Sequence, residues 1–68
     1  MIDPVETLIQ AKNVSEATFR DLIERLGQPD RLENLVFTEG LRAQGSNPQR
    51  AIDCVTVIDR IRSLKIES

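Results

Sequence analysis

The residue of this 68-residue chain best suited to covalent chemistry is its single cysteine, Cys54. A reactive thiol needs a neighbouring base or cation that lowers its pKa. The chain has no histidine to act as that base, and the spacing of Ala51, Cys54 and Ile58 places the thiol on the apolar face of a helix. We therefore interpret Cys54 as a small buried hydrophobic residue and not as a nucleophile or a redox switch.

Three pairs of acidic residues, each three positions apart, could bind a metal ion or transfer protons if they were buried. The pairs are Asp3 and Glu6, Asp21 and Glu24, and Asp30 and Glu33. The first and last pairs also fit helix starts, where a capping residue is followed three positions later by Glu. One thiol without histidine does not make a zinc site, and the three isolated glycines form no phosphate-binding loop. The sequence therefore predicts a protein that is not an enzyme and that binds no metal or cofactor.

The distribution of charge predicts how the two halves of the chain meet. The net charge of −2 argues against a general nucleic-acid binder, which needs a basic patch. Residues 1–40 carry eight acids and four bases, whereas residues 41–68 carry three acids and five bases. We expect the basic end of the chain to pack beside the acidic front half. Exposed ion pairs contribute little each, so they orient more than they stabilise.

DNA binding remains the alternative function. The order of a helix, Gly27 and a second helix is like that of a helix-turn-helix motif. However, Asp30 and Glu33 would lie where the DNA-reading helix meets bases and phosphates, and their negative charge opposes binding. A dimer could still present to DNA the arginines of the C-terminal half: Arg42, Arg50, Arg60 and Arg62. The alternative is therefore a small dimeric DNA-binding regulator that uses these arginines.

No apolar run approaches the roughly 20 residues that a membrane-spanning helix requires. The N-terminus lacks the basic segment and the long apolar core of a signal peptide. Together with the single free thiol, these features predict a cytoplasmic protein without membrane contact.

The length predicts one helical domain over residues 1–68. A core in a chain this short seldom contributes more than about 3–5 kcal/mol, and a single cysteine allows no internal disulfide. Association with a protein partner, or with further copies of the chain, is the remaining source of stability.

The longest uninterrupted helix is predicted at residues 48–65. Asn47 can cap this helix with Pro48 at the first helical position; alternatively, Ser46 caps it and Gln49 reaches back. Apolar residues follow at helical spacing over a broad face that needs two neighbours: Ala51, Cys54, Val55, Val57, Ile58, Ile61 and Leu64.

A β-strand over residues 54–58 competes with this helix, because the run is rich in β-branched residues. The charged residues around the run fall where a helix exposes them. Arg60, Arg62 and Lys65 also lie in the last turns, where cations suit the helix dipole. The helix is therefore the preferred interpretation.

Three shorter helices are predicted near residues 4–12, 14–26 and 30–44. Asp3 and Asn13 act as caps of the first two, and Gly27 ends the second. The third helix starts either with Pro29 inside it or with Asp30 as its cap. It continues through Gly40, at a cost of about 1 kcal/mol relative to Ala, and it stops at Gly45. A glycine inside the helix would let another helix come close. Such short connections make neighbouring helices antiparallel or sharply angled.

The predicted fold is therefore all-α: a small bundle of three to four helices, dominated by an antiparallel hairpin of the last two, with the first two packed across it. Phe37 and Leu41 fall almost opposite the main apolar face of the third helix, which contains Leu32, Leu35, Val36 and Ala43. Either the first helix folds over Phe37 and Leu41, or the pair stays exposed as an interaction patch.

The candidate partner-binding residues are Phe37 and Leu41, together with Val57 and Leu64, which widen the apolar face of the last helix. We expect a non-enzymatic protein-interaction module, such as a small adaptor, co-chaperone or regulator. It would act through an apolar helix face, either as an oligomer or with a protein partner.

Overall fold

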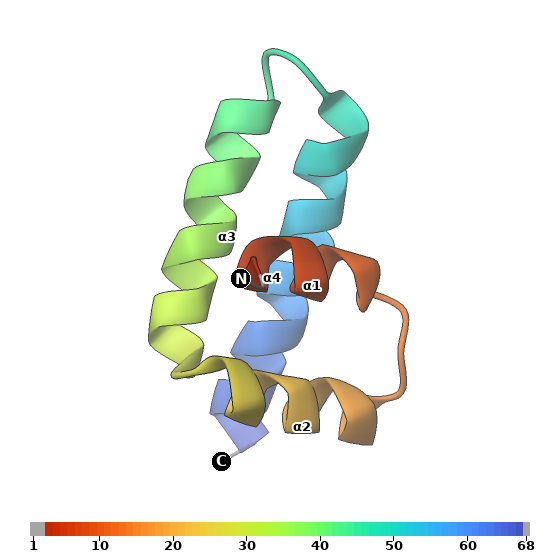
Figure 1. Cartoon of the computed structure of the whole chain (residues 1–68), viewed down its shortest axis with the longest axis vertical. Coiled ribbons are helices and arrows are strands. Elements are labelled where there is room, and N and C mark those ends of the chain that lie inside the picture. Colours follow the sequence, from red (N-terminus) through yellow and green to blue (C-terminus); the bar gives the residue numbers. More distant parts are fainter. Residues whose placement is uncertain (1–2, 68) are drawn as a thin grey trace.

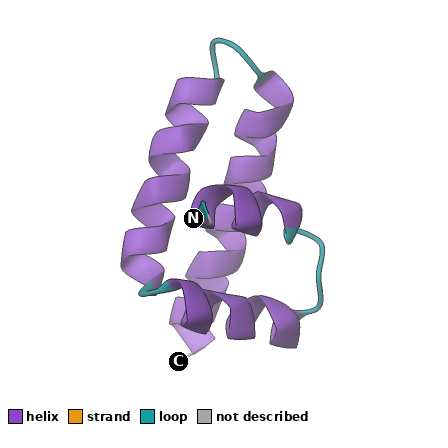
Figure 2. Cartoon of the chain, in the orientation of Figure 1, coloured by secondary structure: helices purple, strands orange, loops and turns teal. Residues whose placement is uncertain are grey.

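The computed structural model describes residues 3–67, which form four helices and no strand. The helices are α1 (Pro4–Gln10), α2 (Glu16–Leu26), α3 (Pro29–Ala43) and α4 (Pro48–Glu67). α3 and α4 lie side by side as an antiparallel hairpin, and the short helices α1 and α2 cross one side of it (Figure 1). Short loops join the elements (Figure 2). The prediction of an all-α bundle dominated by a hairpin of the last two helices is confirmed.

The hairpin starts and stops close to the predicted residues. The Asn47 side chain accepts a hydrogen bond from the Arg50 backbone N–H at 3.2 Å, so Asn47 is the cap of α4. α3 begins at Pro29, with Gln28 as a cap that makes no side-chain hydrogen bond, and it ends at Ala43. Gly40 lies inside α3, as predicted.

The start of α2 differs from the prediction. Ser15 accepts a hydrogen bond from the Thr18 backbone N–H at 3.3 Å, so Ser15, and not Asn13, is the cap. Ser and Asn are both favoured at this position. With Ser15 as the cap, Val14 lies outside the helix, where its side chain packs against the core. α1 is correspondingly shorter than predicted and ends at Gln10.

The core lies where α1 and α2 meet the hairpin. Its largest fully buried side chains come from all four helices: Phe19, Leu8, Leu32, Ile61, Val36, Val57 and Cys54. Complete burial of a large aliphatic or aromatic side chain contributes about 1.5–3 kcal/mol. Two residues that we had placed on the inner faces, Leu35 and Val55, are exposed, because the covered stripe of each helix is narrower than the sequence pattern indicates.

Gly40 allows α3 and α4 to come into close contact. A Cβ atom built at Gly40 would lie 3.2 Å from the Cβ of Cys54, closer than such atoms ordinarily approach. The predicted close approach of another helix at Gly40 is therefore confirmed, and the neighbour is α4.

Replacing Gly40 with Val should lower the free energy of unfolding by about 1–3 kcal/mol, the usual cost of overpacking. Val is a better helix former than Gly, so a loss of stability must come from contact with Cys54. Gly45→Val is the matched control, because nothing lies within 4 Å of a Cβ there; its stability should change by about 0.5 kcal/mol or less. Urea unfolding followed by circular dichroism measures both. Equal stability of Gly40→Val and wild type would contradict the close packing.

Candidate functional site

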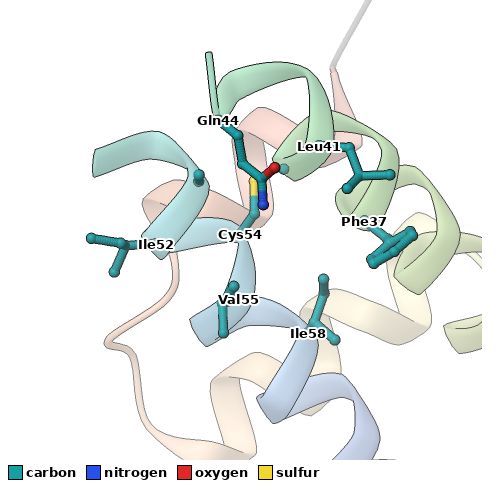
Figure 3. A pocket seen from close by; sticks show the side chains of 9 residues that line it. Phe37, Leu41, Gln44, Ile52, Cys54, Val55 and Ile58 are labelled. Atoms are coloured by element: carbon teal, nitrogen blue, oxygen red, sulfur yellow. The ribbon is translucent and has the colours of Figure 1, made fainter. Parts of the chain in front are cut away.

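An apolar groove runs between α3 and α4 on the side of the hairpin away from α1 (Figure 3). Four large side chains stand around it and remain half exposed or more: Phe37 at 51%, Leu41 at 54%, Ile52 at 58% and Val55 at 58%. The groove has a volume of about 230 Å³. We call this surface the α3–α4 groove; it is lined by Phe37, Gly40, Leu41, Gln44, Ala51, Ile52, Cys54, Val55 and Ile58.

Helix geometry explains why one edge of the groove is left uncovered. Leu32 and Leu41 are nine residues apart, about two and a half turns of helix, so they lie on opposite sides of α3. Leu32 and Val36 are buried in the core with the apolar residues of α1. α1 therefore does not fold over Phe37 and Leu41. Of the two outcomes considered from the sequence, the exposed pair is the one observed.

The four candidate partner-binding residues separate into two groups. Phe37 and Leu41 line the α3–α4 groove. Val57 is fully buried and cannot contact a partner while the fold is intact, so its assignment is corrected. Leu64 is partly buried against the core, outside the groove. The physical reason is that this part of the broad apolar face of α4 belongs to the core, which lies between the hairpin and helices α1 and α2.

Sequence reasoning missed Ile52 and placed Val55 on the buried face of the last helix. The two residues are three positions apart on α4, so a helix places them on one face. That spacing was visible in the sequence. What the spacing did not indicate is that this face lies beside Phe37 and Leu41 of α3.

Cys54 lies at the floor of the groove between the two helices. The side chain is fully buried, and this burial raises the pKa of the thiol above its ordinary value of 9.0, against a smaller opposing effect of Arg50. A protonated, covered thiol is a weak nucleophile. The burial that we predicted for Cys54 is confirmed.

Ion pairs join α4 to the acidic front half, as the charge distribution predicted. Arg50 lies 2.9 Å from Glu6 of α1 and 3.4 Å from Glu39 of α3. At the other end of the hairpin, Lys65 lies 2.8 Å from Glu33. The hydrogen bond from Lys65 lowers the pKa of Glu33 below its ordinary value of 4.5, although partial burial opposes this effect.

The arginines considered for DNA binding are all engaged within the chain. Arg42 lies 3.0 Å from Glu39, and Arg62 lies 3.3 Å from Glu33. Arg60 donates a hydrogen bond to the backbone carbonyl of Lys12 at 2.8 Å, and its guanidinium carbon lies 4.5 Å from the centre of the Phe19 ring. Arg50 makes the two pairs described above.

Residues 3–67 contain no group of three His, Cys, Asp or Glu side chains placed to hold a metal ion. No helix in the same part of the chain is long and apolar enough to cross a membrane. The chain matches no protein-family model, no curated protein and no solved structure. The features of residues 3–67 that bear on function are therefore the α3–α4 groove and the charges of the hairpin.

Cys54 should react slowly with 5,5′-dithiobis(2-nitrobenzoate) in the folded protein at pH 8 and quickly in guanidinium chloride. If exposing the thiol requires an opening of about 3 kcal/mol, the native reaction is about 100-fold slower. Ser63→Cys in a Cys54→Ala background provides an exposed thiol on the same helix, which should react equally fast in both conditions. Equal native rates at the two positions would contradict the burial of Cys54.

Acid should weaken the fold through Glu33. Because the pKa of Glu33 is lowered in the fold, its contribution is complete above the unfolded pKa and is lost as the pH falls through the folded pKa. Glu33→Gln should therefore be less stable than wild type near pH 7, and the difference should shrink as the pH falls below about 4.5. Asp59→Asn, which removes an exposed carboxylate on α4, is the control for the loss of one negative charge. Urea unfolding at a series of pH values measures this, and a pH-independent difference for Glu33→Gln would contradict the assignment.

Proposed function

We propose that this protein is a non-enzymatic interaction module that binds a protein through the α3–α4 groove. The observation that carries the proposal is the gathering of four half-exposed large apolar side chains around one apolar hollow: Phe37, Leu41, Ile52 and Val55. Single exposed apolar residues are normal on a protein surface, whereas a contiguous group of them marks an interaction site.

The energetics of burial support this use of the groove. Complete burial of one such side chain contributes about 1.5–3 kcal/mol. Because each of the four is already about half covered, a partner that completed their burial would gain roughly 3–6 kcal/mol before the costs of association. Those costs are of similar size or larger, so the partner must also cover the surface on both sides of the groove.

The chemistry of the groove favours binding over catalysis. Gln44 and the buried thiol of Cys54 are the only polar side chains among its lining residues, and neither is suited to transfer protons near neutral pH. The free thiol suits a reducing compartment, and we place the interaction in the cytoplasm. Arg42, Arg50 and Arg62 each pair with a carboxylate of the same chain, so DNA binding is the less favoured alternative.

The photoreactive residue p-benzoylphenylalanine, placed at position 37, tests the proposal. In the cells that make this protein, irradiation should give a discrete protein adduct that denaturation does not separate. The same substitution at position 17 is the control, because Ala17 is exposed on α2, on the other side of the hairpin from the groove. Absence of an adduct from position 37, or the same adducts from both positions, would contradict binding through the groove.

A further inference from the structure

We infer that the partner in the α3–α4 groove is the same groove of a second copy of this chain, with the two copies related by a two-fold axis. The inference rests on the proposed function and identifies the partner. It follows from the shape of the groove, from its lack of charge and from the size of the hairpin face.

The groove is shaped to fit its own copy. In a two-fold interface one surface patch meets itself, so the patch must supply both projecting side chains and the space that receives them. Here Gly40, Ala51 and Cys54 give a hollow of about 230 Å³. Phe37 and Leu41 project at the α3 edge (Figure 3). The Phe37 and Leu41 of each copy would enter the hollow of the other.

The charge of the groove permits this self-association. A two-fold axis brings like charges close together wherever a patch is charged, and such contacts are repulsive. None of the residues that line the groove is charged, although the whole chain carries a net charge of −2. Arg50 of the same hairpin pairs with Glu39 and with Glu6 of α1. The groove therefore suits a partner whose surface is uncharged and apolar. The groove of a second copy meets this requirement.

The hairpin face approaches the area that each chain buries in a stable dimer. A typical stable interface buries about 800 Å² from each partner, which is roughly one sixth of the 4666 Å² that this chain exposes. The 20 residues of α4 extend about 30 Å, and two adjacent helices are about 20 Å wide, so the face covers roughly 600 Å² in projection. Side chains that rise from the face add to this area. A second copy lying along it would complete a four-helix arrangement of two hairpins.

Dimerisation would also remove from water the apolar side chains that the isolated chain leaves exposed. A small core gives limited stability, and association is one of the usual remedies. The dimer would cover Phe37, Leu41, Ile52 and Val55 in the working state. The apolar side chains that the isolated chain leaves half exposed would then form a second core between the copies.

Sedimentation equilibrium of the purified full chain tests the inference. Each chain has a mass of 7.7 kDa, and wild type should sediment as two chains and dissociate on dilution. Leu41→Asp should weaken the dimer by more than about 100-fold, because the substitution enters the interface twice. Ala17→Asp, which changes an exposed residue of α2 on the other side of the hairpin, should leave the dimer intact. Circular dichroism establishes that each variant is folded.

A second measurement uses wild type alone and does not depend on the folding of a variant. In a mixture of chains with 13C-labelled methyl groups and unlabelled chains, isotope-filtered NOEs should connect the methyl groups of Ile52 or Val55 with the Phe37 ring of the other copy. A dimer that lacks these NOEs, or that persists unchanged in folded Leu41→Asp, would place the interface elsewhere and overturn the inference.

The inference and the proposed function fail in different ways. If wild type stays monomeric at millimolar concentration while position 37 crosslinks to a different protein, the inferred dimer is overturned. The proposed function then still stands. Monomeric wild type without any adduct from position 37 overturns both. An adduct with the mass of two chains, together with a dimer that Leu41→Asp disrupts, supports both.

Discussion

The close contact of α3 and α4 at Gly40 is the constraint on which the rest of this structure depends. A Cβ at Gly40 would meet the Cβ of Cys54 at 3.2 Å, so only glycine lets the two helices come this near without adjustment. The contact has two consequences. It brings Val36, Cys54 and Val57 into one core with α1. It also leaves small residues at the floor of the groove on the other side of the hairpin.

The two sides of the hairpin are used differently because residues 3–67 contain only two further helices, and both pack on the same side (Figure 1). α1 and α2 cross one side, and the apolar residues there are buried. The ion pair of Arg50 with Glu6 joins α4 to α1, and that of Lys65 with Glu33 joins α4 to α3. Such pairs orient the helices more than they stabilise them. On the opposite side no further helix of residues 3–67 packs over Phe37, Leu41, Ile52 or Val55, and each stays about half exposed. The proposed function follows from this imbalance between the two sides.

The groove and the buried thiol below it are parts of one arrangement. Cys54 is small enough to pack at the helix contact, and its burial raises the pKa of the thiol. The residue that first suggests covalent chemistry therefore serves packing, and the surface above it is apolar. The proposed binding function is consistent with both features.

The sequence alone determined the four helices and the hairpin, because caps, prolines and helical spacing act over a few residues. Asp3, Asn47 and Gly40 take their predicted places for that reason. The sequence also placed Phe37 and Leu41 on one side of α3. Only the tertiary structure decided that α1 packs on the other side, that Val57 is buried, and that Ile52 and Val55 complete the groove. These outcomes depend on contacts between segments distant in the chain, and such contacts leave no local signal in the pattern of residues.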